Sequence, residues 1–146
     1  MDLGWKKYAV SYESEQWYNA WLEYLQALQW EVRIKMEGIK PELEEYRIYR
    51  PKSSGVYLAM ILNRQGKHMG GCLAEFLEFS MARYIYLSND LASYEKELAI
   101  GDSHNEIIIL LESMGDTAIS WVKQELRQLR KRILELEKRL KESSGK

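Results

Sequence analysis

The residues near the C-terminus contain a regular apolar seam that strongly restricts the possible folds. Between residues 119 and 140, apolar side chains recur in alternating steps of three and four, and Lys, Arg and Glu fill the positions between them. This heptad spacing predicts one long amphipathic helix. Its apolar side requires a partner surface, either in the rest of this chain or in another chain, and the sequence leaves both open. The seam residues are Ile119, Val122, Leu126, Leu129, Ile133, Leu136 and Leu140.

The first half of the chain also has helical periodicity. Residues 14–36 contain neither Gly nor Pro and predict a helix with a buried apolar stripe. Gly38 is expected to end this helix, and Pro41 to begin the next one. Residues 50–55 contain a proline and small residues, which predict a break before a helix resumes over residues 56–62. The expected stripe consists of Trp17, Trp21, Tyr24, Leu25, Leu28 and Val32.

The second half begins with a glycine-rich loop, expected over residues 63–71. A long helix should follow and end at Gly101, and because it is apolar on most sides it is expected to be the central helix. Ser103 and Glu106 have the spacing of a capping box, which predicts that Ser103 caps a helix over residues 107–114. Since no segment has a strand pattern, we predict an all-α helical bundle.

Length, charge and cysteine content exclude several classes of protein. The 146 residues are enough for one hydrophobic core, so we predict a single helical domain over residues 1–146 with a frayed tail at 143–146. Lys and Arg number 21 against 22 Asp and Glu, a balance that argues against a nucleic-acid partner. No apolar run approaches the roughly 20 residues that span a bilayer. Cys72 is the only cysteine, which favours a reducing, cytoplasmic setting.

Two other kinds of site have little support in the sequence. His68 and Cys72 are four residues apart and His104 lies farther along, whereas a structural zinc site has denser Cys and His spacing. Nucleophilic catalysis by Cys72 is not indicated either, because nothing in the sequence places a base beside it.

A polar stretch in the predicted long helix is the most informative for function. Asn89, Ser93 and Glu97 are four residues apart, so they share one helix face. Their amide, hydroxyl and carboxylate oxygens are hard ligands that suit Mg²⁺, and Lys96 is placed to contact a phosphate group nearby. Such spacing is typical of a solvated face, but Tyr86 and other apolar residues lie on the same side, which favours a ligand instead.

These residues resemble the second metal motif of the class I terpene synthases. The run from Asn89 to Glu97 matches that motif at its Asn, Ser and Glu ligands and at the Lys before the last Glu. Upstream, Arg50 is similar in position to the diphosphate-sensing arginine of the family. The resemblance covers roughly residues 14–130 and implies that the helical bundle is part of the class I terpenoid synthase fold.

The resemblance also implies a chemistry. Mg²⁺ held by Asn89, Ser93 and Glu97 would assist the departure of diphosphate from an isoprenoid diphosphate substrate, and the resulting cation would cyclise in an aromatic cavity. The catalytic roles fall to Arg50 and Lys96. The residues expected to bind substrate are Arg50, Ser53, Ser54, Gly55, Tyr86 and Lys96.

One element of the family pattern has no counterpart. Its members carry an aspartate-rich cluster for further metal ions, whereas the four aspartates of this chain never form an adjacent pair. We therefore expect a missing N-terminal half, a second polypeptide or a homo-oligomer to complete the site. A helical binding or assembly module without turnover is the first alternative, because one metal stabilises a leaving diphosphate poorly. A structural oligomer built on the C-terminal seam is the second.

Overall fold

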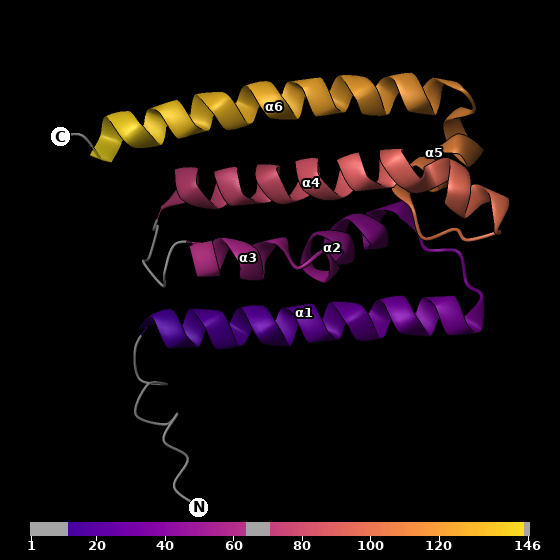
Figure 1. Cartoon of the computed structure of the whole chain (residues 1–146), viewed down its shortest axis with the longest axis horizontal. Helices are drawn as coiled ribbons and strands as arrows, with labels where there is room; N and C mark the ends of the chain where they lie inside the picture. The colour runs from indigo at the N-terminus through magenta and orange to yellow at the C-terminus, as the bar shows by residue number, and fades with distance from the viewer. Residues whose placement is uncertain (1–11, 64–70, 145–146) are drawn as a thin grey trace, which may run out of the picture.

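The computed structural model describes residues 12–63 and 71–144, and its secondary structure there is helical with no strand. The all-α prediction is confirmed. Figure 1 shows the longer helices lying in successive rows, with a short helix at the end of the bundle. The rows are α1 (Tyr12–Glu37), the pair α2 (Leu43–Ser53) and α3 (Val56–Asn63), α4 (Cys72–Ala99) and α6 (Thr117–Ser144), and the short helix is α5 (Glu106–Met114).

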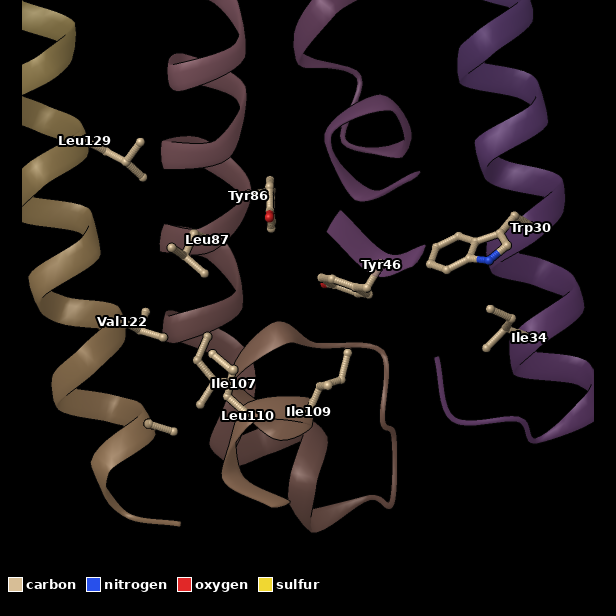
Figure 2. Packing of buried hydrophobic residues seen from close by; sticks show 11 residues of the cluster. Trp30, Ile34, Tyr46, Tyr86, Leu87, Ile107, Ile109, Leu110, Val122 and Leu129 are labelled. Carbon is tan, nitrogen blue, oxygen red and sulfur yellow. The ribbon is translucent and has the colours of Figure 1, made fainter. Parts of the chain in front are cut away.

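The helix α4 is central, as its sequence predicts. It packs against α2, α3, α5 and α6. Its buried residues Tyr86 and Leu87 join a core to which α1, α2, α5 and α6 also contribute, and Figure 2 shows these side chains converging between the helices. The C-terminal half of α4 therefore lies against α2 on one side and α5 on another, and this arrangement positions the candidate site.

The apolar seam of α6 finds its partner inside this chain. Val122 and Leu129 are fully buried, and Figure 2 shows both side chains pointing toward α4. The helix packs along α4 and also contacts α5. Leu134, which is outside the predicted seam, is exposed. The helix continues through Ser144, two residues into the stretch for which a frayed tail is expected.

The predicted helix at the N-terminal end is confirmed as α1, but its predicted buried stripe is wrong. The face that packs against α2 and α3 carries Ala27, Trp30 and Ile34, whereas Leu25 and Val32 are about half exposed. The reason is that α1 is apolar on two sides, and α2 and α3 cover only one of them. A groove of about 730 Å³ follows the other side, lined by Leu25, Leu28, Gln29, Val32, Arg33, Met36 and Glu37.

The helix break before α3 falls within residues 50–55, as predicted, but at the end of this stretch and not at its proline. Pro41 precedes the start of α2 by two residues, with Glu42 at the N-cap, and Pro51 lies inside the last turn of α2. The chain turns at Ser54 and Gly55 instead. Gly55 has a φ of +74°, a backbone conformation that residues other than glycine rarely adopt. Because this conformation is not helical, the chain leaves α2 here and α3 begins after it.

The predicted capping box at the start of α5 is wrong. Asn105 is the N-cap, and its side chain accepts a hydrogen bond from the Ile107 amide at 2.9 Å. Glu106 does not reach back to Ser103, because its carboxylate is fully buried and bound by Arg83. The core contact therefore outweighs the local capping interaction.

The predicted glycine-rich loop lies largely within residues 64–70, outside the described residues, and His68 lies there as well.

Among the helices in the described ranges, none has the length and apolar character needed to cross a membrane.

Candidate functional site

The three predicted metal ligands lie on the C-terminal half of α4. Asn89 is exposed, and Ser93 and Glu97 are half-buried. The Ser93 hydroxyl donates to the backbone oxygen of Asn89 at 2.9 Å, one helical turn back. Because the three residues follow each other at four-residue spacing in a continuous helix, they form the single face that the sequence predicts.

A buried asparagine outside α4 brings two of these side chains together. Asn105 Nδ2 lies 2.9 Å from Glu97 Oε2 and 3.5 Å from Ser93 Oγ, and it also donates to the backbone oxygen of Asp90 at 2.8 Å. The sequence analysis missed Asn105. A signal was available, since asparagine is a favoured N-cap and this one lies two residues before the apolar run 107–111.

Asp90 connects the predicted metal face with Arg50. Its carboxylate, which is only 2% exposed, accepts hydrogen bonds from Tyr46 Oη at 2.5 Å, Arg50 Nη2 at 3.2 Å and the Glu106 amide at 3.0 Å. Burial raises the pKa of Asp90, and the charge of Arg50 and the Tyr46 hydrogen bond oppose that rise. Sequence reasoning also missed Asp90, although it adjoins Asn89.

Arg50 retains an unused donor at this position. Its Nε is buried and has no hydrogen-bond partner among the described residues. Ser53 Oγ donates to the backbone oxygen of Arg50 at 3.3 Å, and Ser54 Oγ donates to that of Pro51 at 2.7 Å. The predicted substrate-binding residues thus lie just beyond Arg50 on the chain, with Ser53 at the end of α2 and Ser54 and Gly55 in the turn that follows it.

The structure places the two other predicted residues differently. Tyr86 is 1% exposed, and its hydroxyl donates to Glu106 Oε1 at 2.9 Å and accepts from Arg83 Nη1. Its ring packs edge-on against Tyr46 in the core. Lys96 is exposed in the last turn of α4 and is not part of the hydrogen-bond network around Asp90.

A second buried cluster lies beside the first and joins four helices. Both Glu106 oxygens accept from Arg83, whose Nη1 and Nη2 lie 3.2 Å away, and Arg47 Nη2 approaches Glu106 at 3.3 Å. Arg83 Nε also contacts Glu125 of α6 at 3.2 Å. Because Glu106 is fully buried and carries several charged partners, this cluster holds α2, α4, α5 and α6 together around the candidate site.

Comparison with known proteins identifies the family. Residues 5–132 match the family model described as terpene synthase family 2, C-terminal metal binding. The chain belongs to the terpene synthase family. The match includes Arg50, the whole of α4 and Asn105, so the residues of the candidate site lie inside the part of the chain that defines this membership.

Curated relatives of this terpene synthase family chain are themselves synthases. Germacrene A synthase of Nostoc punctiforme is 29% identical over 120 residues, covering 72% of this chain and 36% of the relative. Alpha-muurolene synthase of Coprinopsis cinerea is 32% identical over 108 residues, covering 68% and 25%. A (1R,4R,5S)-(-)-guaia-6,10(14)-diene synthase of Fusarium proliferatum is 34% identical over 122 residues, covering 74% and 30%. The chain thus matches about a quarter to a third of each relative, and no solved structure matches it.

The donor set of the terpene synthase motif suits a hard divalent cation. The description of the family as metal binding indicates that this part of a synthase carries metal ligands. Within residues 12–63 and 71–144, no group of three or more His, Cys, Asp and Glu side chains is placed to hold a metal ion. A cation on α4 would therefore take one carboxylate, from Glu97, and neutral oxygens from Asn89 and Ser93, a combination that fits Mg²⁺ better than zinc.

His104 makes the stability of this site region dependent on pH. Its ring is 7% exposed and packs against Trp30 and Tyr46, with Nε2 3.6 Å from Glu31 Oε1. Burial lowers the pKa of His104; Lys35 and Arg50 lower it further, and Glu31 opposes them. The unfolded chain therefore binds more protons below about pH 6.5, and the stability that the neutral imidazole contributes is lost as the pH falls through that value.

We expect His104→Phe to reduce this acid sensitivity. Phenylalanine keeps the aromatic packing but does not titrate, so the free energy of unfolding should fall less between pH 7.5 and 5.5 than in the wild type. Urea unfolding at both pH values measures the difference. An unchanged dependence in His104→Phe would contradict the assignment.

Proposed function

We propose that this chain supplies the second metal motif and the diphosphate-contacting arginine of a terpene synthase active site. Mg²⁺ is held by Asn89, Ser93 and Glu97. Arg50 and Lys96 contact the diphosphate of an isoprenoid diphosphate substrate. The remaining substrate contacts come from Ser53, Ser54 and Gly55, whereas Tyr86, whose hydroxyl is engaged by Arg83 and Glu106 in the core, makes none.

A single arrangement carries this proposal. Asp90 joins Arg50 of α2 to the helix turn that begins with Asn89, and Asn105 joins the same turn to Ser93 and Glu97. The Arg50 guanidinium and the side chains of Ser93 and Glu97, which are 43 and 47 residues farther along the sequence, thereby belong to one hydrogen-bond network, and Asn89 joins it through its backbone oxygen. This is the pairing of a cation site with an anion contact that a metal diphosphate requires.

Arg50 and Lys96 provide different kinds of contact to the diphosphate. Arg50 keeps its orientation through Asp90 and offers its buried, unpaired Nε to an anionic oxygen. Lys96 is exposed and has the reach to add a second positive charge. Mg²⁺, when bound, neutralises the charge that develops on the departing diphosphate.

Further protein is needed to complete such a site. No two aspartates are adjacent in this sequence, so the ligands for additional metal ions must come from elsewhere. The relatives extend well beyond the stretch that this chain matches. We propose that an additional segment or a second polypeptide supplies the remaining ligands.

The test of the metal site is a double substitution. We expect Asn89→Ala with Glu97→Ala to abolish the Mg²⁺-dependent binding of inorganic diphosphate in calorimetry, because two of three ligands are removed, and to leave the far-UV circular dichroism intact. Glu95→Ala removes an exposed carboxylate from the same helix and should bind as the wild type does. Diphosphate binding by the double variant that equals the wild type would contradict the proposed metal site.

A second candidate function is diphosphate binding without turnover. It is favoured by the absence, in the described residues, of any acidic cluster placed to hold further metal ions. Incubation with geranyl, farnesyl and geranylgeranyl diphosphates plus Mg²⁺ separates the two functions. Hydrocarbon released by the chain supports the synthase, whereas intact diphosphate binding with no hydrocarbon supports the binding module.

A further inference from the structure

Asn105 occupies an unusual position between the end of α4 and the start of α5. It is fully buried, and every polar atom of its side chain is engaged. Its Oδ1 accepts from the Ile107 amide at 2.9 Å and caps α5, while its Nδ2 faces α4. One side chain therefore joins the helix that carries the predicted metal ligands to the helix packed beside it.

The Nδ2 group contacts three acceptors on the face of α4. They are the Asp90 backbone oxygen at 2.8 Å, Glu97 Oε2 at 2.9 Å and, more distantly, Ser93 Oγ at 3.5 Å. Since the Ser93 hydroxyl donates its own proton to the Asn89 backbone, its oxygen is left to act as an acceptor. Holding Glu97 by one oxygen fixes its side chain and leaves the other carboxylate oxygen for a cation.

We propose that Asn105 is a positioning residue that presets Glu97 and Ser93 for a divalent cation. The inference rests on the proposed metal site and adds a residue that does not itself bind the metal. An unrestrained Glu97 loses rotamer freedom when it binds a cation, and Asn105 removes part of that loss by ordering the side chain beforehand. Outer partners of metal ligands commonly change metal affinity about 10- to 100-fold when they are removed.

A purely structural role for Asn105 makes a different prediction, and the choice of substitution separates the two. Serine is as good an N-cap as asparagine, so Asn105→Ser keeps the bond to Ile107 but is too short to reach Glu97. We expect this variant to retain helicity and to bind Mn²⁺, used as the paramagnetic probe for Mg²⁺, about 10- to 100-fold more weakly by electron paramagnetic resonance. Asn19→Ser, an exposed substitution on α1, should bind as the wild type does.

A double-mutant cycle tests whether the effect passes through Glu97. If Asn105 acts by holding that carboxylate, Asn105→Ser should weaken Mn²⁺ binding in the wild-type background and have almost no further effect in a Glu97→Gln background. An equal loss in both backgrounds, or Mn²⁺ affinity within twofold of wild type in Asn105→Ser, overturns the proposal. If the serine variant does not fold, Asn105→Thr, which also keeps a capping oxygen, takes its place in the cycle.

The outcome also distinguishes this inference from the proposed function. If the wild-type chain binds no Mn²⁺, the proposed metal site is contradicted, and the positioning role of Asn105 is contradicted with it. If the wild-type chain binds Mn²⁺ and Asn105→Ser binds it equally well, the proposed metal site is retained and only the positioning role of Asn105 is contradicted.

Discussion

Replacing Glu106 by alanine is expected to lower the free energy of unfolding by about 3–5 kcal/mol, the usual effect of breaking a buried ion pair from one side. Glu106 is fully buried and accepts two hydrogen bonds from Arg83 and one from Tyr86. Its removal leaves the Arg83 charge in the core with only the partly exposed Glu125 as a partner. Urea unfolding followed by circular dichroism measures the change.

Glu135→Ala is the matched control for this prediction. Glu135 also pairs with an arginine, Arg139, but both side chains are about 60% exposed. Its removal should therefore change stability by no more than about 0.5 kcal/mol. The double variant Arg83→Met with Glu106→Leu should be more stable than Glu106→Leu alone, because it removes the guanidinium charge left in the core, whereas Arg47 and Glu125, which lose a partner, are partly exposed. A loss below about 1 kcal/mol in Glu106→Ala would show that the cluster does not support the fold.

Leu129→Ala is the second large effect and tests the role of α6. Leu129 is 1% exposed at the contact of α6 with α4, so its truncation should lower the free energy of unfolding by about 2–5 kcal/mol. Leu134→Ala, on the same helix but 59% exposed, should change it by no more than about 0.5 kcal/mol. Thermal and urea unfolding of the two variants give the comparison.

The same pair of variants distinguishes internal packing from an oligomer seam. If α6 packs within its own chain, the loss in Leu129→Ala is independent of protein concentration. A stability that rises with concentration in the wild type and loses that dependence in Leu129→Ala would instead indicate that the seam joins separate chains.

The candidate site was only partly readable in the sequence. The four-residue spacing of Asn89, Ser93 and Glu97 predicts their common face because a helix repeats every 3.6 residues, and α4 is a continuous helix there. Asp90 and Asn105 could not be assigned roles in the same way. They act through contacts with Arg50 and Glu97, and such contacts depend on how α2, α4 and α5 pack.

The errors at α1 and α5 have a common physical origin. Periodicity predicts a helix with apolar positions, but α1 is apolar on two sides, and only the packing of α2 and α3 selects Trp30 and Ile34 over Leu25 and Val32. At α5, the capping-box spacing describes a local interaction of Glu106. The carboxylate binds the buried guanidinium of Arg83 instead, because an unpaired charge in the core is more unfavourable than the loss of the bond to Ser103, and Asn105 caps α5 in its place.

The all-helical class, the positions of the long helices and the single face that carries Asn89, Ser93 and Glu97 were predictable from the residues alone, since all of these follow from local spacing along one chain. The packing of the helices was needed to show which helix faces are covered, that the α6 seam is satisfied internally, and that Asp90 and Asn105 connect Arg50 with the predicted metal ligands. Burial and hydrogen bonding between α2, α4 and α5 join residues that are distant in the sequence. Local periodicity describes one helix at a time and does not specify which residues of different helices meet.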